Sequence, residues 1–230
     1  MEEVLVSSFT EFHDVINRNK KKWSGWFYRG QSKESYKLVP KVGRPPYLTK
    51  YKNDRALFDA WYRHAVGIQD FSTFSQWESL AIAQHHGLAT RLLDWTFNPL
   101  NALYFALYGL EVNISTESNC VVYAHYSVTE FIDLDLEPSP FEIARIRRVR
   151  PNTVSPRIAE QGGIFTVHGT PNLCLEDNLE LGDELVKIII TKESKLELAK
   201  ELSHYGVNSM GLFPDLDGLS SHINWTFVNL

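Results

Sequence analysis

Residues 77–110 read WESLAIAQHHGLATRLLDWTFNPLNALYFALYGL, and this stretch decides the fold. Its first part predicts an amphipathic helix that stops at Gly87, because glycine is the usual residue for a left-handed helix end. Residues 90–96 then predict a short buried strand. Asn98-Pro99 predicts the start of a helix over 100–110, because a capping asparagine followed by proline is a common helix N-terminus. Buried polar groups at these joints must be paired or held for a ligand, so we expect the site here.

The flanking sequence predicts further helices and strands on both sides of this centre. We expect helices over 10–22, 53–66 and 192–205 and strands over 24–30, 120–127 and 184–191. Thr10 is the expected cap of the first helix, and Ser75 with Glu78 predicts a capping box for the central one. Asp215 is expected to cap a last short helix through His222. Residues 225–230 are apolar enough for a strand or a docked extension.

Composition bounds the class of protein. The chain has 230 residues, 43% hydrophobic, with 28 acidic and 23 basic residues and a net charge of −5. This size suits one domain with a real core, and the acidic balance gives no global basic field for nucleic acid. No apolar run approaches membrane-spanning length, and the N-terminus is acidic rather than signal-like, so we expect a cytoplasmic protein that makes no membrane contact. Cys120 and Cys174 are interpreted as reduced, buried thiols, with a disulfide or a catalytic thiol as alternatives.

Three motifs carry a resemblance to a known family. They are WFYRGQ at 26–31, AQHHGLATRLLDWTFNPLNALYFA at 83–106 and LFPDLDG at 212–218. Together they resemble the FRG domain family over most of the chain. The resemblance implies a single domain over 1–230, with an N-terminal helix at 10–22, core motifs over 24–168 and a C-terminal strand, helix and FPDLDG segment over 184–230.

A second resemblance is to the ADP-ribosyltransferases. It is carried by Tyr28-Arg29-Gly30, by Leu93-Asp94-Trp95-Thr96 and by the helix segment 102–106. It implies an α+β fold with a mixed, split central β-sheet and flanking helices. It also implies NAD as co-substrate, nucleic acid or protein as the acceptor, and a role as a bacterial toxin or anti-phage defence effector with a possible neutralising partner.

The same resemblance implies the site residues. The catalytic candidates are Arg29, Asp94, Glu160 and Gln161. The candidates for holding NAD are Arg29, Gly30, Gln31, Tyr36, Gln84, His85, Thr90, Arg91, Trp95, Thr96 and Phe105. Familiar ADP-ribosyltransferases carry a glutamate on a later strand, whereas a strand would point the neighbours Glu160 and Gln161 to opposite faces. If Gln161 faces inward, Asp94 is the candidate substitute.

One cluster leaves alternatives open, and two other groups are rejected as metal sites. The basic cluster is either a rim that contacts nucleic-acid phosphates or a solvated charged face; it comprises Arg145, Arg147, Arg148 and Arg150. His85 and His86 point about 100° apart on a helix, which does not fit a zinc site. The acidic residues 133, 135 and 137 lack the rest of an EF-hand loop. We therefore expect no metal.

Three questions about the site remain open from the sequence. Arg29 is either a ligand contact or the partner of a core carboxylate such as Asp94. The domain is either an enzyme or a non-catalytic nucleotide-binding module in a toxin or sensor complex. A third hypothesis is a hydrolase in which Asp94 orients His85 as a general base.

Overall fold

The fold is α+β and contains two β-sheets. The computed structural model describes residues 1–18, 25–107, 118–152 and 164–230. The first sheet is four-stranded and mixed, in the order β1 (Glu2–Val6), β7 (Glu184–Ile190), β4 (Cys120–Tyr126) and β2 (Trp26–Gln31). β1 and β7 run parallel, and the other pairs are antiparallel. The second sheet is three-stranded and antiparallel, in the order β3 (Leu92–Trp95), β6 (Ile164–His168) and β5 (Ile146–Val149). The predicted α+β class with a mixed sheet is confirmed.

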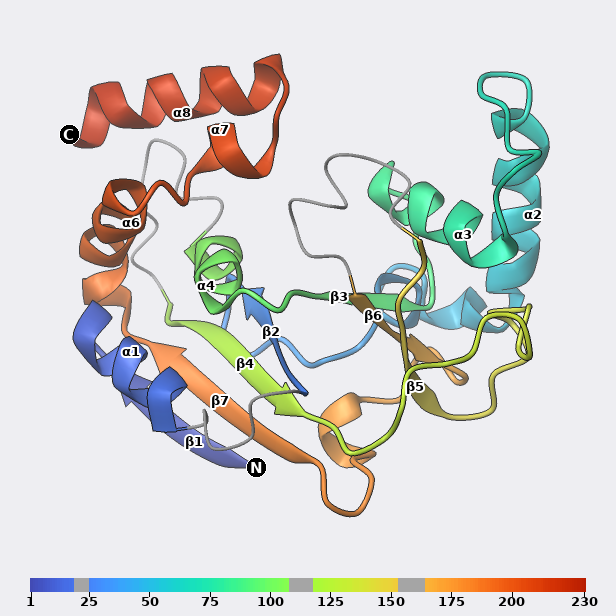
Figure 1. Cartoon of the computed structure of the whole chain (residues 1–230), viewed down its shortest axis with the longest axis horizontal. Coiled ribbons are helices and arrows are strands. Elements are labelled where there is room, and N and C mark those ends of the chain that lie inside the picture. Colours follow the sequence, from blue (N-terminus) through green and yellow to red (C-terminus); the bar gives the residue numbers. More distant parts are fainter. Residues whose placement is uncertain (19–24, 108–117, 153–163) are drawn as a thin grey trace.

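Successive residues of the central strands β4, β6 and β7 are mostly buried, because these strands are covered on both faces. One face of the four-stranded sheet packs on α1 (Phe9–Arg18), α4 (Pro99–Leu107) and α6 (Lys195–His204). Its other face, with Phe27 and Val121, packs against Leu93 and Ile164 of the three-stranded sheet. The far face of that sheet packs on α2 (Asp54–Ala65) and α3 (Gln76–His85). Most of both sheets is therefore covered on both faces, although the edge strand β1 is largely exposed, and the helix groups lie on opposite sides of the sheets (Figure 1).

The two sheets are joined at one point by the backbone. Tyr28 N donates to Thr96 O at 2.7 Å, and Thr96 N donates to Tyr28 O at 2.8 Å. This bridge places the middle of β2 beside the residue that follows β3. The two segments lie far apart in the sequence, and the bridge fixes the backbone from which their side chains project.

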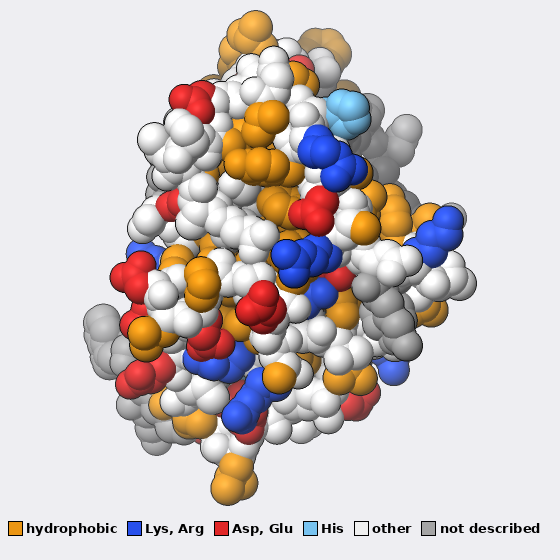
Figure 2. All heavy atoms as spheres, turned by 90° about the vertical axis from the view of Figure 1, so that its right-hand side faces the viewer, with side chains coloured by type: hydrophobic (Ala, Val, Ile, Leu, Met, Phe, Trp, Pro, Cys, Tyr) orange, Lys and Arg blue, Asp and Glu red, His pale blue; other side chains and the backbone are white. Residues whose placement is uncertain are grey.

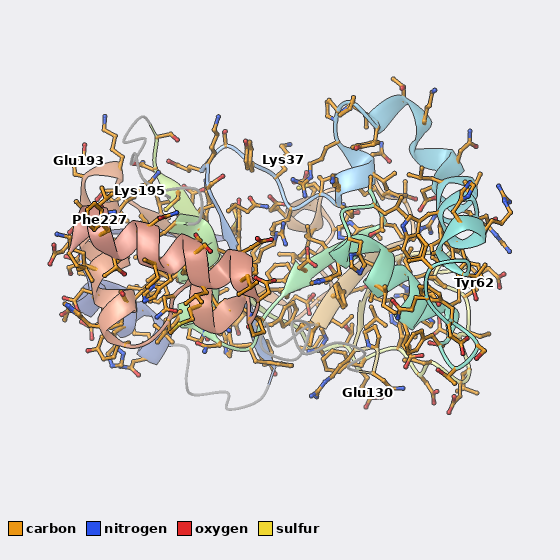
Figure 3. The ribbon with its side chains drawn as sticks, turned by 90° about the horizontal axis from the view of Figure 1, so that it is seen from above. Lys37, Tyr62, Glu130, Glu193, Lys195 and Phe227 are labelled. Atoms are coloured by element: carbon orange, nitrogen blue, oxygen red, sulfur yellow. The ribbon has the colours of Figure 1, made fainter. Side chains whose placement is uncertain are left out.

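The remaining elements are short or lie at the periphery. The 3₁₀ turns are η2 (Lys41–Gly43), η3 (Leu48–Asn53), η4 (Leu175–Asp177) and η5 (Lys192–Ser194), and the last helices are α7 (Ser209–Leu212) and α8 (Leu216–Asn229). Seen from above, α8 with Phe227 lies at the opposite end of the molecule from Tyr62 of α2 (Figure 3). None of the helices in the described part of the chain combines the length and hydropathy needed to span a bilayer.

Most of the predicted helix boundaries are confirmed. Ser75 and Glu78 form the capping box of α3, and Gly87 follows that helix with φ +91°. Asn98 Oδ1 accepts from Leu100 N at 2.9 Å at the start of α4. Asp215 caps α8 by accepting from Gly218 N at 2.8 Å. Both cysteines are free and buried, as expected.

Two predictions about the chain ends are wrong. The first helix begins at Phe9, and Ser8 Oγ accepts from Glu11 N at 3.2 Å, so Ser8 takes the capping position expected for Thr10. Residues 19–22 of that prediction lie outside the described residues. The tail after Trp225, expected as a strand or a docked extension, is not a strand and continues α8 to Asn229. Apolar residues recur there at helical spacing, and this periodicity outweighs the β-propensity of the tail.

Candidate functional site

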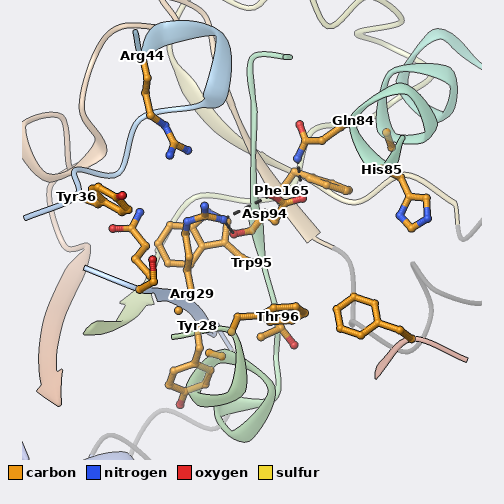
Figure 4. A pocket seen from close by; sticks show the side chains of 17 residues that line it. Tyr28, Arg29, Tyr36, Arg44, Gln84, His85, Asp94, Trp95, Thr96 and Phe165 are labelled. Atoms are coloured by element: carbon orange, nitrogen blue, oxygen red, sulfur yellow. Dashed lines mark hydrogen bonds and ion pairs between the residues drawn. The ribbon is translucent and has the colours of Figure 1, made fainter. Parts of the chain in front are cut away.

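A cavity of about 500 Å³ lies where β2, β3, α3 and α4 meet. Ligand pockets for small molecules commonly have this volume. The end of β2 contributes Arg29, β3 contributes Asp94, and the last turn of α3 contributes Gln84 (Figure 4). The predicted site residues in its lining are Arg29, Gly30, Gln31, Tyr36, Gln84, His85, Asp94, Trp95, Thr96 and Phe105. Segments that are distant in the sequence therefore converge on one cavity.

Two guanidinium groups and one carboxylate dominate the charge of this cavity. Arg29 Nη1 donates to the Asp94 carbonyl oxygen at 2.7 Å and lies 3.5 Å from Asp94 Oδ2. Arg44 donates from Nε to Val39 O at 2.7 Å, and its guanidinium points toward that of Arg29 (Figure 4). Burial lowers the pKa of both arginines, and Asp94 opposes that effect at each of them. Arginine stays protonated at neutral pH, so one carboxylate faces two cations and the cavity favours an anion.

The Arg29–Asp94 ion pair is incomplete. The Asp94 side chain is 61% exposed, and its closest approach to Arg29 is longer than an ordinary charge-assisted hydrogen bond. In the part of the chain that the structure describes, Arg29 Nε has no hydrogen-bond partner. Arg29 therefore lies beside Asp94 and also lines the cavity, but the exposed Asp94 is not the core carboxylate of the structural alternative. Contact of Arg29 with a ligand stays a prediction.

Asp94 is held from its other side by α3. Gln84 Nε2 donates to Asp94 Oδ1 at 2.6 Å, and Gln84 Oε1 accepts from the hydroxyl of Thr90. Thr90 is buried and does not line the cavity. Its predicted role in contacting NAD is replaced by one in orienting Gln84.

Aromatic rings form much of the remaining wall. A hydrogen bond fixes the orientation of the Trp95 ring, because Trp95 Nε1 donates to Thr166 Oγ1 at 3.1 Å. Thr166 Oγ1 lies 3.3 Å from His168 Nε2, and His168 Nδ1 lies 3.0 Å from Leu173 O. A carbonyl oxygen only accepts, so Nδ1 carries the proton and Nε2 accepts from Thr166. Burial, with a smaller effect of Arg29, lowers the pKa of His168 to about 4, so this chain stays neutral and holds Trp95 in place.

Gly30 lines the cavity, but the absence of a side chain at this position is required by packing. A Cβ at this position would lie 1.9 Å from Ala102 O and 2.4 Å from Ala106 N of α4. Only a residue without a side chain lets α4 approach β2 this closely. Gly30 therefore sets the distance between Arg29 and the helix that carries Phe105.

Arg91, a predicted NAD contact, has a structural role instead. Its Nε and Nη2 donate to Asp54 Oδ2 and Oδ1, both at 2.7 Å, and its guanidinium lies 4.9 Å from the centre of the Phe141 ring. Both side chains of the ion pair are buried. The prediction is corrected because α2 supplies a carboxylate that the sequence pattern around Arg91 does not reveal.

The four arginines of the predicted nucleic-acid rim do not line the cavity. Arg145 pairs with Glu180 and Arg147 with Glu137, both at 3.2 Å. Arg148 is buried, with its guanidinium 4.5 Å from the Phe131 ring centre, and Arg150 is exposed beside Phe97. On the face turned to the viewer in Figure 2, basic and acidic side chains are interspersed. Three of the four are therefore engaged within the fold.

Some predicted site residues are not among the described residues, and some residues of the cavity lining were not predicted. Glu160 and Gln161 lie outside the described residues. In the described ranges, no group of three or more His, Cys, Asp and Glu side chains is placed to hold a metal ion. No site role was predicted for the lining residues Tyr28, Ser32, Arg44, Ala81, Ala102, Phe165 and Phe213. Arg44 lies in a proline-rich loop at residues 43–47, and Phe213 lies in the LFPDLDG motif.

Comparison with known proteins finds one family model, which matches part of the chain. Residues 24–113 match the model of the FRG domain. The matched range runs from β2 to the end of α4 and therefore includes most of the cavity lining. No curated protein and no solved structure matches the chain.

Proposed function

Because residues 24–113 match the FRG domain and contain most of the cavity lining, we propose that the protein binds NAD in this cavity and transfers ADP-ribose to a macromolecule. The acceptor is nucleic acid or protein. The observation that carries the proposal is the convergence of Arg29 and Arg44 on Asp94 in a cavity walled by aromatic rings. The extension of the domain over 1–230 stays a prediction.

The lining fits the parts of a dinucleotide. Paired guanidinium groups bind phosphate oxygens in bidentate geometry, which suits a diphosphate. Aromatic side chains stack on flat heterocycles, and the lining residues Tyr36 and Phe105, which are not fully buried, are available for this. With about 500 Å³, the cavity falls in the range of sites that bury most of a small ligand.

The proposed chemistry assigns a role to the carboxylate. An acceptor oxygen or nitrogen attacks the ribose carbon, the bond from that carbon to nicotinamide breaks, and its electron pair leaves with neutral nicotinamide. The sugar is oxocarbenium-like in the transition state, and a carboxylate stabilises such a cation. In the described lining, Asp94 is the carboxylate, and it is also placed to take the acceptor proton.

The backbone supports the resemblance to ADP-ribosyltransferases. That resemblance rests on Tyr28-Arg29-Gly30 and on the segment ending in Thr96, and the bridge between Tyr28 and Thr96 joins these two segments. An ADP-ribosyltransferase-like arrangement of the split sheet is therefore part of the proposal. So is the setting that the resemblance implies: a cytoplasmic bacterial toxin or anti-phage effector, with a possible neutralising partner.

One observation favours a second candidate, a nucleotide-binding module without turnover. Asp94 Oδ1 already accepts from Gln84, and Oδ2 lies near Arg29. A carboxylate engaged on both oxygens stabilises charge well but is a poorer proton acceptor. A binding module in a toxin or sensor complex would use the same arginines and aromatic rings.

Incubation with NAD separates the two candidates. Wild-type protein is mixed with NAD labelled in the adenylate phosphate and with protein or RNA from a lysate. Transfer of label together with release of nicotinamide supports the transferase. Saturable NAD binding without nicotinamide release supports the module. Absence of NAD binding contradicts both. Asp94→Asn is the matched variant, because it keeps the shape and removes the charge; we expect it to bind NAD and transfer no label.

A further inference from the structure

The contacts of Gln84 point to a device that keeps the Arg29–Asp94 pair open. Gln84 lies in the last turn of α3, and Asp94 lies on β3. The bond from Gln84 Nε2 to Asp94 Oδ1 is 2.6 Å long, whereas Arg29 Nη1 lies 3.5 Å from Asp94 Oδ2. An arginine and a carboxylate left alone close to about 2.7–2.9 Å. Asp94 is therefore held closer to a neutral amide than to a cation.

Thr90 fixes the orientation of this amide. A carboxylate only accepts, so the Gln84 amide must turn its nitrogen toward Asp94 and its oxygen toward Thr90. The Thr90 hydroxyl donates its single proton to Gln84 Oε1, and its oxygen accepts from Leu92 N at 3.1 Å. Leu92 is the first residue of β3. The bonds thus run from the backbone of β3 through Thr90 and Gln84 to Asp94 of the same strand.

Closure of the pair would remove charge from the cavity. If Asp94 made a bidentate contact with Arg29, both would be neutralised for a ligand, and Arg44 would remain as the free cation of the described lining. Because the Asp94 side chain is 61% exposed, it has room to rotate once the Gln84 bond is lost. The bond therefore decides between an open anion site and a closed ion pair.

We propose that Gln84, oriented by Thr90, is a positioning residue that prevents Asp94 from closing onto Arg29 and so keeps the Arg29 guanidinium open for the phosphates of a nucleotide. This inference rests on the proposed function, because it specifies how the nucleotide-binding cavity is kept competent. It assigns to Thr90 an effect on ligand affinity although Thr90 does not line the cavity.

The test measures binding of ADP by calorimetry, so it does not depend on transferase activity. In Gln84→Leu we expect the Kd for ADP to rise about tenfold, equivalent to about 1.4 kcal/mol at 25 °C. Thr90→Val is expected to move in the same direction by less, and Thr90→Ser, which keeps the hydroxyl, should retain wild-type affinity. Gln69→Leu is the control, because Gln69 is exposed and lies outside the lining.

A double variant separates positioning from a direct contact between Gln84 and ADP. Asparagine at 94 cannot form the ion pair, so Gln84→Leu should cost no affinity in an Asp94→Asn background. An equal loss in both backgrounds overturns the proposal, as does unchanged ADP affinity in Gln84→Leu. Thermal unfolding of each variant shows that it is folded.

A crystal structure of Gln84→Leu keeps this proposal distinguishable from the proposed function. If wild-type protein binds neither ADP nor NAD, the proposed function fails. The positioning role is then decided by the distance between Arg29 and the Asp94 carboxylate: closure from 3.5 Å to a direct hydrogen bond supports it, and an unchanged distance overturns it.

Discussion

Two arginine–aspartate pairs in this protein have the same chemistry and different surroundings. Arg91 and Asp54 are both buried and make two bonds of 2.7 Å. Arg29 and Asp94 approach to 3.5 Å, and the carboxylate is largely exposed in a cavity. The first pair is complete within the protein, so it ties α2 to the start of β3. The second is left incomplete, so its charges remain available to a ligand. The completeness of the pair, more than the residue types, separates a structural from a functional role.

The largest expected effect is on stability when one partner of the complete pair is removed. Asp54→Ala leaves the Arg91 guanidinium buried without its carboxylate, and we expect the free energy of unfolding to fall by about 3–5 kcal/mol. Asp94→Ala should cost less than about 1 kcal/mol, because that pair is open to solvent. Urea unfolding of both variants measures the difference. Similar losses of unfolding free energy in the two variants would contradict the difference between a structural and an open ion pair.

The next largest effect is on NAD binding. Here a substitution in the Arg29–Asp94 pair should cost more affinity than one in the Arg91–Asp54 pair. Arg29→Lys keeps the charge and loses the forked geometry, so we expect NAD affinity to fall by about 1–3 kcal/mol, or about 5–150-fold. Arg91→Lys should leave the Kd for NAD unchanged and reduce stability, because lysine cannot bond both Asp54 oxygens at once. Calorimetric titration with NAD and thermal unfolding separate the two variants. Loss of NAD binding in Arg91→Lys would contradict the structural role of Arg91.

A smaller effect concerns pH. Burial and then Arg29 lower the pKa of His168 from 6.5 to about 4, so the folded state binds fewer protons than the unfolded state in this range. The resulting stability is fully present above pH 6.5 and is lost as the pH falls toward 4, with a slope of at most about 1.4 kcal/mol per pH unit from this group. Arg29→Met removes one cause of the shift, so the slope between these pH values should decrease.

The matched variant for this pH prediction is Arg91→Met, which should leave the slope unchanged. Urea unfolding at a series of pH values gives both slopes. His168→Gln provides the limiting case, because it removes the titrating group. Equal slopes in wild-type protein and Arg29→Met would mean that Arg29 does not act on His168, and the uncompensated charge that distinguishes the open pair would lose its support.

The sequence predicted the parts of the fold that depend on local signals. Gly87, the Ser75–Glu78 capping box and Asn98-Pro99 each act within a few residues, and the structure confirms the boundaries they set. The tail after Trp225 was predicted less well, because its apolar residues were considered without their helical spacing. The pairing of β3 with β6 in a second sheet depends on contacts between distant residues, and such contacts leave no local signal.

The candidate site was likewise predicted where local motifs mark it and missed where contacts between distant residues decide it. Arg29, Asp94 and Gln84 were predicted because they lie in recognisable motifs, and the cavity brings them together. Thr90 and Arg91 belong to the same motif as these residues, yet they face Gln84 and Asp54 instead of the cavity. A motif shows which residue types recur together and does not show which side chains face inward. That information comes from the partners that α2 and α3 provide.

The smallest expected effect concerns Arg44, a cation of the cavity for which no site role was predicted from the sequence. Its Nε donates to Val39 O, so part of the side chain holds the loop at residues 43–47 while the rest points toward Arg29 (Figure 4). Arg44→Gln should weaken ADP binding about two- to fivefold, since a second, partly engaged cation contributes about 0.5–1 kcal/mol. The same substitution in Arg29→Lys should cost more than in wild-type protein if both guanidinium groups bind one diphosphate, because neighbours that share a ligand are not additive. Calorimetry on the four proteins tests this coupling. Strict additivity would place Arg44 outside the anion site and leave Arg29 as its single cation within the described lining.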